Sequence, residues 1–285
     1  LSLRHRFNSS TEGSPYQNTP LIMPDGSIYS MCWQGGANGH GTFFHMGWSQ
    51  IRPTVIKHLD GINYGSRPIG GLLRTRSGKI YGLTSKGGLN GDGIILEYDP
   101  AQDSLRKVFD FNSPSTGGVP YGTLLEANNG LLYGLASEGG LHGKGVFFEF
   151  NPISRVYSVL KSFNGSTEGS APRGNLMQAS NGKLYGCATS QTFPAKDVIF
   201  EYDIQTSSFS IVYTWNNTKR GKYAYGTLVE RVPGILIGTT YGGGAALKGS
   251  LFEFNIQTKE LHQKVNFGGS PNGAQPRASM LKMPD

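Results

Sequence analysis

The stretch "GLLYGLASEGGLHGKGVFFEF", residues Gly130–Phe150, decides the fold. Four glycines, Gly139, Gly140, Gly143 and Gly145, stand between two apolar runs. Such a stretch fits either a glycine-rich loop that cradles a phosphate or a turn between two strands. A phosphate loop needs a helix directly after it, because the first amides of that helix point at the anion. The apolar run "VFFEF" follows instead, so the sequence predicts a structural turn rather than a nucleotide site.

The same pattern recurs along the chain every 52 residues without insertion or deletion. A fixed period of this length is the signature of a repeat architecture, and positions that stay constant in it are expected to be structural. One constant column is Gly26, Gly78, Gly130, Gly182 and Gly234. Further columns are Tyr29, Tyr81, Tyr133, Tyr185 and Ile237; Phe44, Leu96, Phe148, Phe200 and Phe252; and Phe7, Leu59, Phe111, Phe163, Trp215 and Phe267.

Each repeat is predicted to contain four short strands, named a to d. In the third repeat they cover residues 121–127, 131–137, 146–150 and 156–163. Aromatic and branched residues fill these segments, while Asn, Gly, Pro and Ser mark the turns between them. Repeated units of four antiparallel strands are typical of a β-propeller, whose blades bury their faces against one another. A β-solenoid is the alternative, but its coils are usually shorter than this repeat.

We therefore expect an all-β fold in which residues 1–285 form a single β-propeller domain. The full repeats are placed at about 15–66, 67–118, 119–170, 171–222 and 223–274, and residues 1–14 and 275–285 form a partial repeat. Residues 3–7 and 278–282 should lie in the same incomplete blade or beside the same gap. Six repeats need 312 residues, 27 more than the 285 present. Either the ring closes imperfectly or the natural chain is longer and completes a six-bladed ring, and the second alternative is favoured. The start at Leu1 favours a processed or trimmed N-terminus.

The composition limits the classes of partner. Charged residues make up 16% of the chain and its formal net charge is +7, which favours weak attraction to anionic partners. The basic residues are dispersed, so nucleic-acid binding is not expected. No apolar run is long enough for a membrane-spanning helix. Cys32 and Cys187 form neither a disulfide framework nor a metal motif, and both are expected to be buried thiols. No cofactor and no metal are expected.

The repeat resembles that of the bacterial GloVer tandem-repeat proteins, a choice-of-anchor family. The motifs "GKIYGLTSKGG", "GLLYGLASEGG", "GKLYGCATS" and "GKGVFFEF" carry this resemblance, which covers the whole chain. The first repeat departs from the pattern at Ser30 and over residues 45–48, and the fourth replaces its glycines with "SQTFPAKD". The resemblance implies an exported, surface-attached propeller. It implies no established activity, so no catalytic residue can be carried over.

The functional face is expected where the b–c and d–a connections meet, because those loops are longer and more variable. Strand a should line the central channel, and its first position varies chemically from repeat to repeat: Gln17, Ile69, Tyr121, Arg173, Tyr225 and Arg277. Aromatic rings and guanidinium groups suit sugars or carboxylates. The b–c loops add Trp33, His40, His142, Lys144, Lys196, Tyr241 and Lys248. The alternative is that these side chains are solvated residues that pack the channel mouth.

One further position is variable in a single repeat. His45 stands where the other repeats have Glu97, Glu149, Glu201 and Glu253. Because four repeats keep the glutamate, it is expected to be structural. A partnered structural histidine is the favoured interpretation of His45, and a functional one is the alternative.

These residues favour an exported or cell-surface propeller that binds a glycan or a partner protein at the b–c face. One alternative is a carbohydrate-active enzyme, a polysaccharide lyase or hydrolase. In a lyase, Tyr or His would remove the proton beside a carboxylate held by Arg, and Tyr121 with Arg173 is the first pair to test. A scaffold subunit of an outer-membrane or surface complex is the second alternative. No Ser-His-Asp, zinc or paired-carboxylate motif stands out, so a non-enzymatic role is favoured and no catalytic residue is assigned.

Overall fold

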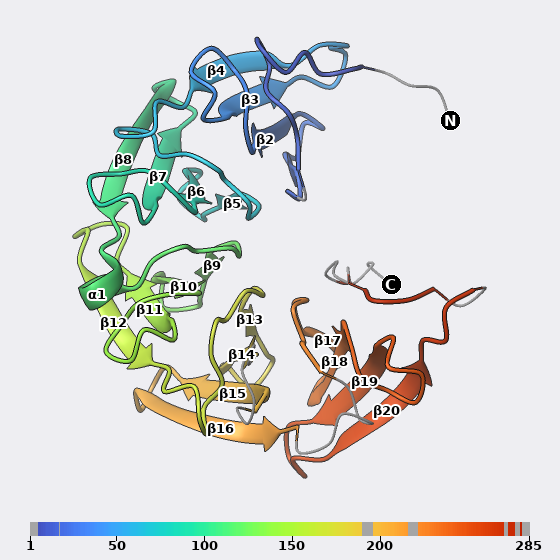
Figure 1. Ribbon diagram of the computed structural model, residues 1–285. Helices are drawn as coiled ribbons and strands as arrows, with labels where there is room; N and C mark the ends of the chain where they lie inside the picture. The colour runs from blue at the N-terminus through green and yellow to red at the C-terminus, as the bar shows by residue number, and fades with distance from the viewer. Residues whose placement is uncertain are drawn as a thin grey trace.

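The computed structural model describes residues 5–16, 18–189, 196–215, 222–270, 273–276 and 280. These residues form five four-stranded antiparallel sheets, which follow one another in chain order around a common centre (Figure 1). The predicted all-β propeller architecture is confirmed. Helix in the described part of the chain is limited to the single turn α1, Ser113–Thr116. No described helix is long and apolar enough to cross a membrane.

Each sheet holds the four strands of one repeat, with the first strand towards the centre and the last at the outside (Figure 1). The first sheet contains β1 (Leu21–Ile22), β2 (Ile28–Cys32), β3 (Thr42–Met46) and β4 (Thr54–His58). The second contains β5 (Leu73–Arg74), β6 (Ile80–Thr84), β7 (Ile94–Asp99) and β8 (Ser104–Asp110). The third contains β9 (Leu125–Glu126), β10 (Leu132–Ala136), β11 (Val146–Phe150) and β12 (Tyr157–Ser162). The fourth contains β13 (Met177–Gln178), β14 (Leu184–Ala188), β15 (Val198–Asp203) and β16 (Ser208–Thr214). The fifth contains β17 (Val229–Val232), β18 (Ile235–Thr240), β19 (Ser250–Asn255) and β20 (Leu261–Asn266).

The innermost strand is the element that the sequence predicted least well. Strand a of the third repeat was expected over residues 121–127, but β9 covers only Leu125–Glu126. The residues before it bond to the next sheet instead: the amide of Thr123 donates to Asn175 Oδ1 at 2.7 Å. A Cβ atom on Gly122 would lie 2.7 Å from the carbonyl oxygen of Gly174. Close backbone approach near the centre therefore replaces strand pairing there.

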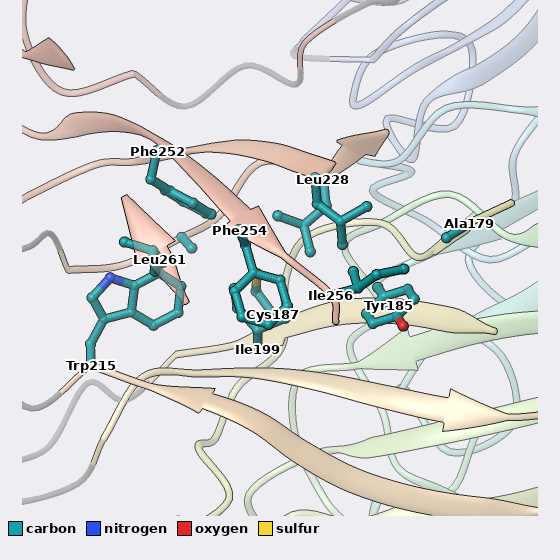
Figure 2. Close-up of a cluster of buried hydrophobic side chains, with 12 residues drawn as sticks. Ala179, Tyr185, Cys187, Ile199, Trp215, Leu228, Phe252, Phe254, Ile256 and Leu261 are labelled. Atoms are coloured by element: carbon teal, nitrogen blue, oxygen red, sulfur yellow. The ribbon is translucent and has the colours of Figure 1, made fainter. Parts of the chain in front are cut away.

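The hydrophobic core is divided into four clusters, one between each pair of consecutive sheets. Figure 2 shows the cluster between the fourth and fifth sheets. The column predicted to be equivalent is buried in every repeat: Phe44, Leu96, Phe148, Phe200 and Phe252. Strands β10 and β14 have no exposed position because neighbouring sheets cover both of their faces. Burial on both faces explains why these strands do not alternate between apolar and polar residues.

The two end sheets are covered less completely. Ile237 and Leu251 of the fifth sheet are partly exposed, whereas their counterparts in the fourth sheet, Tyr185 and Ile199, are buried. At the other end, Phe7 packs on Phe44 with ring centroids 5.4 Å apart. Residues 278–282, the expected partner of this segment, lie outside the described residues except for 280. Closure into a six-bladed ring stays a prediction.

The repeated glutamates are structural, as expected. Glu97 is buried and accepts hydrogen bonds from Tyr81, Arg106 and Lys79, with the lysine at 3.0 Å. Glu201 has the same kind of neighbours and is also bonded by Lys259 of the fifth sheet at 3.0 Å. Glu97 therefore joins strands within its own sheet, and Glu201 also links the fourth sheet to the fifth.

His45 takes that place in the first sheet. Its ring lies 4.7 Å from the ring of Tyr29, in the position where the other sheets pair a tyrosine or isoleucine with glutamate. The favoured structural interpretation of His45 agrees with this contact.

Candidate functional site

The b–c loop of the third repeat and the connection to the fourth repeat meet at one end of the sheets. Together they line a pocket of about 200 Å³. Its walls are formed by Ser137, Glu138, Gly143, Lys144, Ser170, Ala171 and Arg173. The two kinds of loop were expected to share one end of the blades, and at this pocket they do.

Backbone contacts hold these two loops together in the same way in several repeats. The amide of Ala171 donates to the carbonyl oxygen of Lys144 at 2.8 Å, and Ala171 itself has a φ of 41°. This left-handed geometry is disfavoured for residues with a side chain. It nevertheless recurs at one repeat position, which holds Arg67, Val119, Ala171, Tyr223 and Gln275. The backbone at this position is therefore structural, while its side chain is free to differ.

Arg173 and Tyr121 form a cation–π pair beside the pocket. The Cζ atom of Arg173 lies 4.7 Å from the centroid of the Tyr121 ring. Its Nε atom is buried and has no hydrogen-bond partner within the described part of the chain. Lys144 adds a second positive charge to the wall, and Glu138 adds one negative charge. An arginine beside a pocket, held by an aromatic ring and with an unmet donor, suits an anionic group.

A second group of aromatic side chains lies between the fourth and fifth sheets. The rings of Tyr223 and Tyr225 are parallel, with centroids 5.8 Å apart and an interplanar angle of 3°. Tyr241 lies against Tyr225 at 5.9 Å. The Nζ atom of Lys222 lies 4.5 Å from the Tyr223 ring centroid, and a hydrogen bond with Tyr223 raises the pKa of this lysine. We call Tyr223, Tyr225 and Tyr241 the tyrosine cluster.

A third group lies between the first and second sheets. The ring centroids of Trp33 and Tyr16 lie 5.3 Å apart, and the Cζ atom of Arg67 lies 5.5 Å from the centroid of the Trp33 ring. The carbonyl oxygen of His40 accepts the amide of Arg67 at 3.3 Å. The imidazole of His40 packs on Gly61, which indicates a structural part for this histidine.

The pocket and the tyrosine cluster are adjacent. A Cβ atom on Gly174 would lie 3.0 Å from the carbonyl oxygen of Tyr225, so the backbones that carry Arg173 and Tyr225 are in contact. The same close approach joins Gly122 to Gly174. The segments that lead into consecutive sheets therefore place Tyr121, Arg173 and Tyr225 side by side around the centre.

The candidate residues are thus distributed over three groups. The structure brings together Tyr121 with Arg173 and Tyr225 with Tyr241, and it places Trp33 and His40 in another sector. His142 is exposed in its loop, as are Lys144 and Lys196. Gln17 and Arg277 lie outside the described residues.

Sequence reasoning missed four residues that complete these groups, namely Tyr16, Arg67, Lys222 and Tyr223. Arg67 and Tyr223 occupy the position two residues before the variable column, and that position changes as strongly between repeats. Its variation was the signal that could have identified them.

The described residues offer no chemistry for a resident metal or a reactive thiol. Within them, no three His, Cys, Asp or Glu side chains are grouped so that they could hold a metal ion. Cys32 and Cys187 are free and buried, as expected. Burial raises the pKa of Cys32 to about 11 and that of Cys187 to about 12, so both remain thiols at neutral pH.

Several solved structures share this fold. TolB from Acinetobacter baumannii matches with a TM-score of 0.55 and 12% identity, over 91% of this chain and 56% of that chain. The structure of a nidogen/laminin complex matches with a TM-score of 0.56 and 14% identity, over 90% and 82%. An oligogalacturonate lyase in complex with manganese matches with a TM-score of 0.56 and 10% identity, over 88% and 65%. At these identities the likeness shows the fold alone, and TolB and nidogen/laminin are β-propellers.

This chain spans little more than half the length of the TolB chain. No curated protein matches it. The sequence model of the Gloeobacter/Verrucomicrobia repeat matches residues 1–192 and 166–285, which together cover the whole chain. The resemblance inferred from the 52-residue motifs is confirmed, and the chain belongs to the Gloeobacter/Verrucomicrobia repeat family.

Proposed function

We propose that the protein is an exported binding propeller that holds a carboxylate-bearing glycan at the face formed by the b–c and d–a loops. The observation that carries this proposal is the position of Arg173. Its guanidinium is held over Tyr121 beside a pocket, and Lys144 lies on the same wall. Its Nε donor is buried and has no partner among the residues that the structure describes. Arginine binds carboxylates through two parallel hydrogen bonds, and lysine adds a point charge.

The equivalent place in the preceding sector is built differently. There Asp92 stands at the repeat position of Lys144, and its Oδ2 atom accepts a hydrogen bond from the backbone amide of Ser113 at 2.7 Å. In that sector, Tyr121 of the third repeat stands at the repeat position of Arg173. A structural role common to all blades does not require a positive charge at either position, which supports a ligand-binding role for Arg173 and Lys144.

The cellular location is part of the proposal and rests on the resemblance to exported, surface-attached repeat proteins. A protein partner that presents acidic side chains would use the same cations. The glycan is favoured because an aromatic ring and an arginine together fit a sugar acid, which offers an apolar ring face and a carboxylate on one small unit.

A lyase is the second candidate, and the contact between Tyr121 and Arg173 is the observation that favours it. In that reaction the deprotonated Tyr121 oxygen would take the proton beside the sugar carboxylate while Arg173 holds that carboxylate. The C–O bond to the neighbouring sugar would break, and the leaving oxygen would receive the proton from Tyr121. Cleavage would create a double bond in the product, which absorbs ultraviolet light.

Calorimetric titration with galacturonate oligomers tests the binding function. Arg173→Gln removes the charge and should weaken binding about 10- to 100-fold, because one charge-assisted hydrogen bond contributes about 1.5–3 kcal/mol. The matched control is Arg155→Gln, an exposed arginine in the turn after β11, at the opposite end of the blades. Unchanged affinity in Arg173→Gln, or no binding of any acidic sugar, would overturn the proposal. Ultraviolet-absorbing products would replace it with the lyase.

A further inference from the structure

We infer that the ligand is an oligosaccharide of at least two sugar acids, with one carboxylate on Arg173 and the next ring stacked on the tyrosine cluster. This inference rests on the proposed function and adds the size and shape of the ligand. Its starting point is the contact between the backbones of Gly174 and Tyr225. That contact makes the pocket and the tyrosine cluster neighbouring parts of one surface rather than two separate sites.

On this surface the rings of Tyr223 and Tyr225 are parallel. Their interplanar angle of 3° means that both rings face the same direction, and Tyr241 borders them at 5.9 Å. All three tyrosines are only partly buried. Aromatic rings that are half exposed present an apolar face while their hydroxyl groups meet water or polar groups. A pyranose ring has the same two characters, because its C–H bonds cover its faces and its hydroxyl groups lie at its edge.

The fold does not require these tyrosines. Tyr223 has a φ of 61°, a geometry in which a bulky side chain is disfavoured, and other repeats place Val119 or Ala171 at this position. The left-handed backbone is common to the repeats, whereas the tyrosine ring is not, so the ring rather than the backbone is a candidate for a functional role.

Tyr241 replaces a residue with a clear structural part. The second and third repeats have Ser85 and Ser137 there, whose hydroxyls donate to the carbonyl oxygens of Arg67 and Val119, each at 2.8 Å. A tyrosine side chain is too long to repeat that local bond. In place of this serine hydroxyl, the fifth repeat presents an aromatic ring that is partly exposed.

The charges fit an acidic chain better than a neutral one. On one side of the contact, Lys144 and Arg173 outnumber Glu138. On the other side Lys222 lies over Tyr223, near the carboxylate of Asp197 that accepts a hydrogen bond from the Tyr223 amide at 2.6 Å. A chain of sugar acids presents a carboxylate on every ring, so successive rings can meet a cation at each end of this surface. Arg173 and the tyrosine cluster belong to consecutive repeats, so a single sugar acid is expected to contact one of them and a longer chain both.

Affinity as a function of ligand length tests this inference. The probes are galacturonate, its oligomers of two, three and four residues, and tetraglutamate, which carries similar charge without sugar rings. The variants are Tyr223→Ala and Tyr225→Ala, with Tyr225→Phe to keep the ring. Ile69→Ala is the matched control, because Ile69 occupies the same repeat position in the second repeat. Thermal melting verifies that each variant is folded.

The wild-type protein should bind the dimer at least tenfold more tightly than the monomer. Each alanine variant should lose roughly three- to tenfold in affinity for the oligomers, as expected for a lost ring contact, and should keep its affinity for the monomer. Tyr225→Phe and Ile69→Ala should behave like the wild type. The inference is wrong if the oligomers bind no more tightly than the monomer, or if tetraglutamate binds as tightly as the galacturonate tetramer. Carboxylate binding by Arg173 would stand in both cases. If no acidic sugar binds at all, the proposed function and the inference are both wrong.

Discussion

The ring of Phe163, just after β12, packs against the ring of Phe200 in β15 of the next sheet, with centroids 5.6 Å apart. The same contact joins the preceding pair of sheets at 5.5 Å, and Trp215 repeats it in the following pair, also at 5.5 Å. Each contact links residues of neighbouring repeats. Stability in this architecture is therefore concentrated between sheets, because each repeat is stabilised mainly by its neighbours.

Removal of one of these rings should destabilise the protein strongly. Phe200→Ala leaves a cavity at a fully buried position and should lower the free energy of unfolding by about 3–5 kcal/mol. Urea denaturation followed by circular dichroism measures this change. Ile153→Ala is the control, since Ile153 is 93% exposed and its removal should have little effect. Equal losses in both variants would contradict a core that lies between the sheets.

Close backbone approach at the centre leads to a second prediction. A Cβ atom on Gly70 would lie 2.0 Å from the carbonyl oxygen of Gly122, which the backbone cannot easily move. Gly70→Ala should therefore lower the free energy of unfolding by at least 1–3 kcal/mol, as overpacking does. Gly268→Ala is the matched control, because nothing lies within 4 Å of its Cβ position and its φ is not left-handed. An unchanged melting temperature for Gly70→Ala would show that the inner strands are farther apart.

Acid should destabilise the protein through the buried glutamates. Burial acts to raise the pKa of Glu97, but hydrogen bonds from Tyr81, Arg106 and Lys79 outweigh it and hold this pKa below the ordinary value of 4.5. The carboxylate binds protons less readily in the folded than in the unfolded chain. Its contribution to stability is therefore fully present above about pH 4.5 and is lost as the pH falls below that value.

Urea denaturation at a series of pH values between 7 and 3 measures this loss. Glu97→Gln should be less stable than the wild type at pH 7 and should lose less stability on acidification. Glu260→Gln, which removes a carboxylate that is 65% exposed, is the control. If Glu97→Gln shows the full pH dependence of the wild type, the buried carboxylate is not its source.

The fold was predictable because the repeat carries its own internal comparison. Columns such as that of Phe148 stay apolar in five units, and the strand over residues 146–150 was placed without error. The inner strand was predicted too long, since the partners of residues 121–123 lie in the next repeat. A local sequence pattern indicates that a segment can form a strand. It does not indicate which sheet accepts the hydrogen bonds of its backbone amides.

The site was predictable in part. Variation within one column identified Tyr121 and Arg173, and the structure places them in contact. Tyr223 was missed because only the column two residues later was considered, although the column of Tyr223 varies as strongly and its ring lies against that of Tyr225. The contact between Gly174 and Tyr225 joins two repeats at the centre and follows from the arrangement of the sheets rather than from any motif.

The two buried cysteines should respond differently to local opening. Cys32 belongs to the first sheet and is covered there by the N-terminal segment: a Cβ atom on Gly13 would lie 2.6 Å from Cys32 Cβ. The hydroxyl of Thr42 donates a hydrogen bond to the carbonyl oxygen of Glu12 at 2.6 Å, and Thr42 is paired with Cys32 on the adjacent strand. Cys187 belongs instead to the core cluster between the fourth and fifth sheets (Figure 2). Release of one segment exposes the first thiol, whereas two whole sheets must separate to expose the second.

We therefore expect a thiol reagent to modify native Cys32 faster than Cys187, and both to react at once in urea. Phe7 anchors the N-terminal segment through its ring contact with Phe44, so Phe7→Ala should accelerate the modification of Cys32 and leave the rate at Cys187 unchanged. Peptide mass spectrometry after timed exposure to a maleimide measures both rates in one sample. Ile153→Ala, at an exposed turn, is the control and should change neither rate. Equal acceleration at both cysteines in Phe7→Ala would mean that they become accessible only through global unfolding, because local opening of the segment changes the rate at Cys32 alone.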